Sequence, residues 1–231
     1  MSRKTAKSPR LQDRDYEILE HLLQYRLTTP EVLHKLFFQD SDRNAVTKVT
    51  SRLTQHGFIA AHPLFASNTY FGFGPDGAKL YGLAPKYAKP LGVQSLITEY
   101  GALAYCCLGA TLRQRLRVGE IHARYPQLLR GRIDNSHYYL DHDGELTRLG
   151  YIRVDGGGTP DHVARKCQSD IEQRLKHPPF AEVIEGGRFL IGVATFTQPK
   201  ADMISRRLEQ LTGPVKFRVE VAPNLVNLLA P

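Results

Sequence analysis

Hydrophobic residues recur at helical spacing through the first quarter of the chain. Their spacing by three and four predicts a first helix over residues 13–26 and a third over residues 43–56, where Gly57 ends it. Between them, Thr29 is an N-cap followed by a proline, so a second helix is predicted over residues 30–37. The apolar positions that carry the pattern in the first and third helices are Ile18, Leu19, Leu22, Leu23, Val46, Val49 and Leu53. The chain is therefore expected to begin with three short helices.

The pattern then changes to short β-prone runs. Residues 58–64 and 69–73 are joined by the short segment of residues 65–68, which predicts a β-hairpin. Residues 84–92 hold two prolines and two lysines, which is typical of a linker, and a connecting helix is predicted to follow over residues 94–108.

Strand-like and helix-like segments alternate in the remainder. The strands are predicted at residues 137–140, 148–154, 189–197 and 215–221, and the helices at residues 160–176 and 199–211. This alternation predicts a mixed α/β C-terminal domain, so the fold class is expected to be α+β. The expected organisation is a flexible basic arm over residues 1–10, a domain over 11–83, a linker and connecting helix over 84–117, and a domain over 118–231.

Charge narrows the choice of partner. The chain has 231 residues and a net charge of +8, from 31 Lys and Arg against 23 Asp and Glu. Residues 1–90 hold 13 basic and 8 acidic residues, so the smaller N-terminal part is the more basic one. A basic protein of otherwise ordinary composition most often has nucleic acid as its partner. The arm carries Arg3, Lys4 and Lys7, which are expected to contact phosphates.

Other classes of protein are disfavoured by what the sequence lacks. No apolar run approaches the ~18 residues of a membrane span, and the N-terminus has no signal-peptide pattern, so a cytoplasmic protein without a membrane partner is expected. The three cysteines include no C-x-x-C pair, which indicates neither a disulfide framework nor a zinc site. No cofactor is expected.

The polar face of the predicted third helix supports a DNA-binding interpretation. With the valines and Leu53 facing inward, the outward positions contain no carboxylate; they are Arg43, Asn44, Thr47, Lys48, Thr50, Ser51 and Gln55. Arg and Asn can each make two hydrogen bonds to a base edge, whereas Lys, Thr and Ser suit phosphate oxygens. Arg52, at the edge of this face, would contact phosphate or form a local salt bridge. Asn68, at the hairpin tip, is the candidate wing contact.

Three helices followed by a hairpin is the element order of a winged helix-turn-helix, whose third helix lies in the major groove. The alternative is a three-helix packing module whose polar helix is only solvated.

The sequence also shows a family resemblance. The stretch LQDRDYEILEHLLQYRLTTPEVLHKLFF, with RNAVTKVTSRLTQHGFIAAHPL and NTYFGFGPDGAKLYGL after it, resembles the winged helix of the replication-relaxation family of bacterial plasmids and integrative elements. The matching positions are Thr28, Leu33, Leu53, Gly57 and residues 74–77.

The resemblance, which covers residues 11–83, also implies a C-terminal domain similar to the restriction-endonuclease core. An active core of that kind holds a divalent metal with a strand Asp and a Glu-x-Lys-like pair on the next strand. In GYIRVDGGGTPDHVARK, Arg153 stands where the first acid is expected and Asp155 remains. Asp134 and Asp141 are both candidates for the preceding-strand acid. A guanidinium would repel a cation, so a nuclease-like fold without a metal and without catalysis is expected.

Three further groups have two interpretations each. His137, Asp141, His142 and Asp143 would ligate a metal or simply form a turn. The glycines of residues 156–158, with Thr159, would cradle a phosphate or make a tight strand-to-helix turn. The arginines at positions 113, 115 and 117 would contact DNA or pair with acids. For each of the first two groups the turn is the favoured interpretation.

The sequence thus predicts a sequence-specific double-stranded DNA-binding protein of a bacterial mobile element, regulating replication, transfer or transcription. A homodimer partner and replication or conjugation proteins are further candidate partners. Two alternatives remain open. One is a metal-dependent DNA nuclease, and the other is a protein-interaction adaptor in a conjugation, replication or defence complex.

Overall fold

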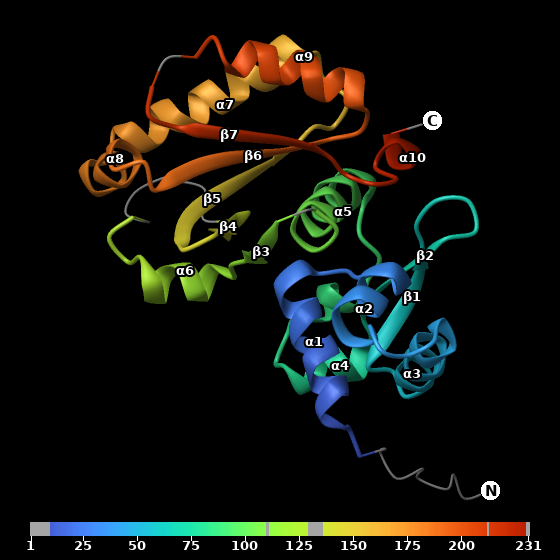
Figure 1. Cartoon of the computed structure of the whole chain (residues 1–231). Helices are drawn as coiled ribbons and strands as arrows, with labels where there is room; N and C mark the ends of the chain where they lie inside the picture. Colours follow the sequence, from blue (N-terminus) through green and yellow to red (C-terminus); the bar gives the residue numbers. More distant parts are fainter. Residues whose placement is uncertain (1–9, 110, 129–135, 212, 230–231) are drawn as a thin grey trace, which may run out of the picture. The chain divides into compact units, whose positions relative to one another are not determined.

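The computed structural model of the chain describes residues 10–109, 111–128, 136–211 and 213–229. The chain forms two compact units, Met1–Leu91 and Gly92–Pro231. Both units combine helices with a sheet, so the expected α+β class is confirmed (Figure 1). Within the described ranges, no helix has the length and apolar character needed to cross a bilayer.

The first unit contains three helices, a two-stranded antiparallel hairpin and two short helical turns after it. The elements are α1 (Asp13–Tyr25), α2 (Pro30–Phe37), α3 (Arg43–Gln55), β1 (Ile59–Pro63), β2 (Thr69–Phe73), α4 (Pro75–Leu80) and the 3-10 helix η1 (Pro85–Ala88). The helices and the hairpin lie within two residues of the bounds that the hydrophobic pattern predicts.

Local capping explains why these helices begin where they do. The Oγ1 of Thr29 accepts a hydrogen bond from the backbone N–H of Val32, 3.3 Å away, at the start of α2. The carboxylate of Asp42 does the same for Ala45 at the start of α3, at 3.0 Å. Each bond satisfies a backbone donor that has no partner inside its helix. At the other end of α3, Gly57 adopts a φ of 70°, a left-handed conformation that glycine takes without strain.

A hydrophobic core holds the first unit together. It joins one face of each helix to the hairpin; its fully buried members are Ile18, Leu19, Leu22, Leu33, Leu53 and Ile59. An isolated β-bridge adds to this core, because Thr28, in the loop between α1 and α2, pairs with Phe71 of β2. The loop before α2 thus contributes a third, single-residue strand beside the hairpin.

The predicted domain boundary at residue 83 is too early. The backbone N–H of Leu91 donates a hydrogen bond to the phenol oxygen of Tyr70 in β2, at 2.8 Å. Ala88 packs against the core of the first unit. The segment expected to be a linker therefore folds in large part onto the first unit.

The second unit is built on a five-stranded mixed sheet with strand order β3-β4-β5-β6-β7. The strands β3, β4 and β5 are antiparallel neighbours, whereas β5, β6 and β7 are parallel. Its elements are α5 (Val93–Cys107), β3 (Leu112–Arg115), α6 (Val118–Arg124), β4 (Tyr138–Asp143), β5 (Leu146–Val154), α7 (Pro160–Leu175), α8 (Pro178–Glu185), β6 (Phe189–Thr195), α9 (Gln198–Leu208), β7 (Lys216–Val221) and α10 (Val226–Leu229).

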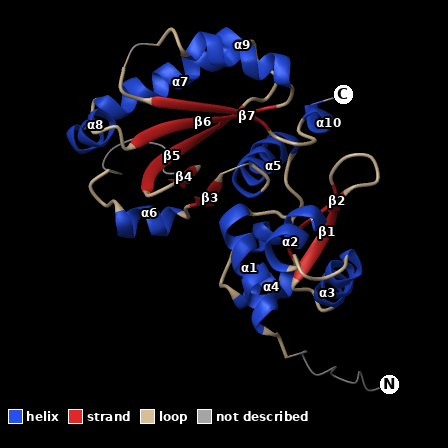
Figure 2. Ribbon diagram, viewed as in Figure 1, coloured by secondary structure: helices blue, strands red, loops and turns tan. Residues whose placement is uncertain are grey.

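Helices cover both faces of this sheet. The α7 and α9 helices pack side by side on one face, and α5 lies on the other (Figure 2). The parallel connections explain this arrangement, since each crossover between parallel strands needs a helix. Two glycines make room on the α5 side: a β-carbon at Gly150 would overlap the ring of Tyr139, and one at Gly192 would overlap the phenol of Tyr105.

The segment predicted as linker and connecting helix, residues 84–117, is therefore not a linker. From residue 93 onward it belongs to the second unit, because α5 packs on the sheet and β3 forms its edge. Three short helices of four to eight residues, α6, α8 and α10, were not predicted from the sequence.

Candidate nucleic-acid interface

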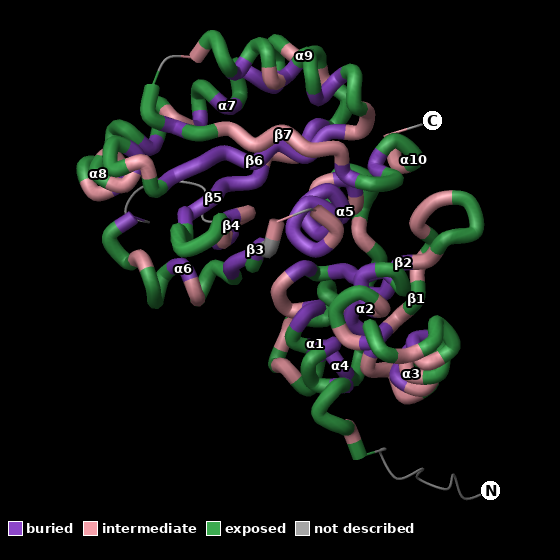
Figure 3. Tube along the Cα trace, in the orientation of Figure 1, coloured by how far each residue is buried: buried purple, intermediate pink, exposed green. Residues whose placement is uncertain are grey.

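The α3 helix has one buried face and one exposed face. Val46 and Leu53 are buried in the core of the first unit, and Val49 packs against it. Figure 3 shows exposed and buried positions along α3. All the residues predicted to read DNA from this helix except Arg52 are exposed; they are Arg43, Asn44, Thr47, Lys48 and Ser51. Gln55, near the end of the helix, is exposed as well. The structure thus brings five predicted site residues onto one helix surface.

One predicted outward residue does not belong to this surface. Thr50 is buried, and its hydroxyl donates to the carbonyl oxygen of Val46 at 2.9 Å. A threonine inside a helix can satisfy its hydroxyl in this way on the preceding turn. Thr50 is therefore part of the packing of α3 and not of its exposed face.

Arg52 forms a local salt bridge, which is one of the two roles that the sequence suggested for it. Its Nη2 donates to Oδ1 of Asp15 on α1, at 2.6 Å. The side chain of Asp15 is 1% exposed and that of Arg52 is 32% exposed. The other carboxylate oxygen of Asp15 accepts the backbone N–H of Gln12, 2.8 Å away. Arg52 thus links α3 to the first turn of α1.

The acid nearest to the exposed face is Asp42, the N-cap of α3. Its Oδ1 accepts the N–H of Ala45, so the carboxylate is directed at the helix terminus. The positive end of the helix dipole offsets part of its charge. The exposed face beyond it carries Arg43 and Lys48 without an intervening carboxylate. The side chains of this face itself are therefore positively charged or neutral.

The hairpin tip offers small polar side chains and no basic ones. Asn68 is exposed, and its backbone N–H donates to the carbonyl oxygen of Phe65 at 2.8 Å. The tip turn also contains Ala66 with a φ of 46°. Asn68 is therefore held at a defined point of the tip. The predicted arm contacts Arg3, Lys4 and Lys7 lie outside the residues that the structure describes.

The three arginines after α5 pair with acids. Arg113 donates through Nη1 to Oε2 of Glu220, at 2.8 Å, and Arg115 donates to Glu99 at 2.6 Å. Arg117 lies 3.4 Å from Glu120 at the start of α6. Burial alone would lower the pKa of Arg113, but the hydrogen bond to Glu220 and the nearby phenols raise it above its usual value. Arg113 and Arg115 are buried, which removes both from a DNA surface.

The strand register decides which candidate acids of the second unit lie together. Asp141 on β4 stands opposite Arg148 on β5. Asp155 follows seven residues after Arg148, which is roughly 23 Å along an extended strand. The two carboxylates therefore lie toward opposite ends of the sheet and cannot share a metal ion. Asp134, the other candidate, lies outside the described residues.

Each of these carboxylates has basic partners. Asp141 is fully buried and lies 3.5 Å from Arg113 and 3.5 Å from Arg218. Asp155 is buried and accepts hydrogen bonds from Thr195 and, through an ion pair of 2.8 Å, from Lys200. Among the described residues, no three His, Cys, Asp or Glu side chains gather as a metal-binding group.

The predicted alternatives for His137 and the glycine run are also decided by geometry. His137 precedes β4 and lies beside Arg115, about 13 Å along the strand from Asp141. The run of glycines connects β5 to α7, where Thr159 caps the helix by accepting the N–H of His162. Gly157 donates its N–H to Asp155 and has a φ of 103°. This segment is a tight strand-to-helix turn.

The charged partners of Asp155, Asp141 and Arg113 were not predicted from the sequence. Lys200, Arg218 and Glu220 were not singled out, because their partners are 45 to 107 residues away in the sequence. Alternating charged and apolar residues in residues 216–221 were a signal that this strand has a polar face. Burial raises the pKa of the Cys167 thiol to about 12, so this cysteine is a poor nucleophile at neutral pH.

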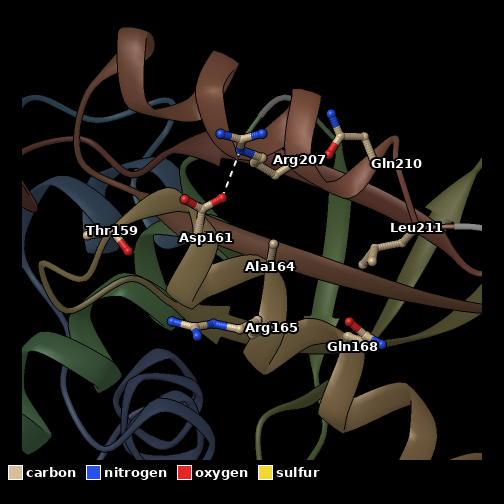
Figure 4. A pocket seen from close by; sticks show the side chains of 8 residues that line it. All are labelled: Thr159, Asp161, Ala164, Arg165, Gln168, Arg207, Gln210 and Leu211. Carbon is tan, nitrogen blue, oxygen red and sulfur yellow. Dashed lines mark ion pairs between the residues drawn. The ribbon is translucent and has the colours of Figure 1, made fainter.

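A shallow hollow of about 460 Å³ lies between α7 and α9 on the outer surface of the second unit (Figure 4). Arg165 and Arg207 line it, and Nε of Arg207 lies 2.8 Å from Asp161. Two amide side chains, Gln168 and Gln210, complete its polar lining. The ion pair offsets one of the two guanidinium charges of this hollow.

Comparison of the sequence with protein-family models gives no match, and no curated protein matches it significantly. The resemblance to the replication-relaxation family therefore rests on the residues quoted for it.

Proposed function

We propose that this chain binds double-stranded DNA through its first unit, which we interpret as a winged helix with α3 as the recognition helix. The observation that carries the proposal is the exposed face of α3. It presents Arg43, Asn44 and Lys48 on the side opposite a buried apolar stripe, with no carboxylate among them. A helix of this kind can lie in the major groove while its buried face keeps it on the domain.

The connectivity of the first unit supports the same interpretation. Two helices separated by a short loop precede α3, and a hairpin follows it. The bridge between Thr28 and Phe71 ties the loop before α2 to this hairpin. The hairpin would serve as the wing, with Asn68 as its contact to the DNA backbone or minor groove.

Different residues have different roles in this proposal. Arg43 and Asn44 have side chains that can make two hydrogen bonds to one base edge, so they would carry sequence specificity. Thr47, Lys48 and Ser51 would contact phosphates and fix the position of the helix. The basic arm would add further phosphate contacts.

The role proposed for the second unit is support and not catalysis. A mixed sheet between helix layers is compatible with a restriction-endonuclease-like core. Arg153 stands where the resemblance places the first acid of such a core, and its guanidinium pairs with Asp170. The guanidinium would repel a divalent cation at that position. We therefore propose that this unit mediates dimerisation, protein contact or additional backbone contact in a regulator of a bacterial mobile element.

The test is a fluorescence-anisotropy titration of a labelled random duplex with the full chain at several salt concentrations. Binding that weakens steeply with salt is expected, because phosphate contacts release counterions. The same samples, incubated with Mg²⁺ and run on a denaturing gel, are expected to contain intact DNA. Absence of binding at low salt would favour the adaptor role, and Mg²⁺-dependent cutting would favour the nuclease.

Two substitutions separate the proposed roles. Lys48→Ala is expected to weaken binding to all duplexes alike and to lower the salt slope by about one unit. Asn44→Ala is expected to cost about 1 to 3 kcal/mol, mainly on the preferred site once one has been selected. The matched control is Lys79→Ala, which replaces an exposed lysine of α4. It should change neither the affinity for DNA nor the salt slope.

A further inference from the structure

A second surface of the first unit has a different chemistry from the face of α3. A groove of about 640 Å³ lies between α4 and the segment that contains η1. We call it the lysine-rimmed groove, and its lining residues are Pro75, Ala78, Lys79, Gly82, Leu83, Pro85, Ala88 and Lys89. None of them belongs to α3 or to the hairpin.

The floor of the lysine-rimmed groove is apolar and rests on the core. Ala78 is buried, and Leu83 and Ala88 pack against the same core from the side of the groove. The N–H of Leu83 donates to the carbonyl oxygen of Ala78 at 2.8 Å, which fixes the turn between the two walls. The groove is therefore a formed feature of the fold.

The two elements beside the groove also expose large apolar side chains that are not part of its lining. Leu80 on α4 is 49% exposed and Tyr87 on η1 is 39% exposed. The η1 helix contains no buried residue. A groove with an apolar floor is typical of a surface that binds another molecule.

Charge restricts what that molecule can be. The eight described residues that line the groove include two lysines, Lys79 and Lys89, and no acidic side chain. A third lysine, Lys86, is exposed on η1 beside them. The acid of α4, Asp76, lies against Gly57 in the turn after α3 and is not part of the lining. A ligand that complements this surface has apolar groups for the floor and carboxylates for the rim.

We infer that the lysine-rimmed groove binds a segment of a partner protein in which apolar and acidic residues are combined. A duplex does not fit this site, since an apolar floor gains nothing from phosphates. The apolar side chains of the segment would fill the groove beside Leu83 and Ala88. Its carboxylates would pair with Lys79 and Lys89. This inference stands independently of DNA binding by α3.

The test begins with selection from a display library of peptides, each about 12 residues long, long enough for two or three anchor side chains. The bait is the immobilised full chain. The most enriched peptide is then synthesised with a fluorophore, and its affinity is measured by anisotropy. Enriched peptides are expected to combine Leu, Ile or Phe with an excess of Asp and Glu.

Charge reversal locates the binding site. Lys79→Glu/Lys89→Glu is expected to weaken binding of the selected peptide by about tenfold or more, a difference that affinity measurements resolve easily. Lys166→Glu/Lys176→Glu, at exposed positions on α7 and at its C-cap, changes the net charge equally and should leave the affinity within about twofold. An analogue of the peptide with Lys in place of its acids should prefer the groove variant over the wild type.

Several outcomes would overturn the inference. No enrichment, or enrichment of peptides without acidic residues, would do so. Equal losses in both double variants would mean general charge attraction and not a site. Concentration-dependent self-association that disappears in Lys79→Glu/Lys89→Glu, without peptide binding, would assign the groove to a second copy of the chain.

Discussion

Replacing Arg52 by alanine separates a structural role from a DNA contact. Arg52 lies at the edge of the proposed recognition face, yet it donates to the buried carboxylate of Asp15 at 2.6 Å. If the salt bridge is its main role, Arg52→Ala should destabilise the first unit. If phosphate contact is its main role, the substitution should lower the salt slope of DNA binding.

The structure sets the size of the expected effect. Removing one partner of a buried ion pair costs roughly 3 to 5 kcal/mol, whereas exposed pairs contribute about 1 kcal/mol or less. Asp15 is almost fully buried, but Arg52 is one third exposed and the N–H of Gln12 still stabilises the carboxylate. We therefore expect Arg52→Ala to cost about 2 kcal/mol. Arg43→Ala, on the exposed face of the same helix, should change the stability by less than about 0.5 kcal/mol.

Hydrogen exchange of the amides of α1 and α3 in the full chain measures this cost, because the opening free energy of each segment is read directly. The two variants should behave in opposite ways in the DNA titration. Arg43→Ala should lower the affinity for the preferred site, and Arg52→Ala should leave the salt slope unchanged. Unchanged exchange in Arg52→Ala together with a salt slope lower by about one unit would refute the structural role.

Three other predictions concern stability. Burial lowers the pKa of His21 from 6.5 to about 4, so the unfolded chain binds this proton at higher pH than the folded one. Acidification from about pH 6.5 to about pH 4 should therefore cost the first unit about 3 kcal/mol, and urea unfolding of His21→Gln should lack this part of the pH dependence. Gly150→Ala should destabilise the second unit by about 1 to 3 kcal/mol through overlap with a buried tyrosine ring, whereas Gly119→Ala, in open space on α6, should not; thermal melting distinguishes them. Asp155→Ala should cost roughly 3 to 5 kcal/mol in the same assay by leaving the ammonium of Lys200 buried and unpaired, and Lys200→Met should recover part of the loss in the double variant.

Local signals made the helices of the first unit predictable. The N-caps Thr29 and Asp42 and the terminating Gly57 all act within four residues of the elements that they limit. The exposed residues of α3 were predicted from the helical spacing of its apolar residues. Thr50 was misplaced because its hydroxyl is satisfied inside the helix, which its residue type does not reveal.

Interactions between distant residues account for what was missed in the second unit. The edge strand β3 was interpreted as part of a linker because its partner β4 lies more than 20 residues later. The partner of Asp141 on β5 was not predicted for a related reason, since only the strand register shows that Arg148 is opposite it. The lysine-rimmed groove likewise depends on how α4 and η1 pack and has no sequence pattern of its own.

The claim that α3 contacts DNA is tested most directly by comparing two double variants in the salt titration of duplex binding. Arg43→Ala/Lys48→Ala removes two positive charges from the exposed face of α3, and Lys79→Ala/Lys89→Ala removes two from the lysine-rimmed groove. The account predicts that the first variant weakens binding and lowers the salt slope, by about 0.9 for each phosphate that the protein no longer neutralises, while the second keeps the slope of the wild type. Equal slopes in the wild type and the α3 variant would contradict it.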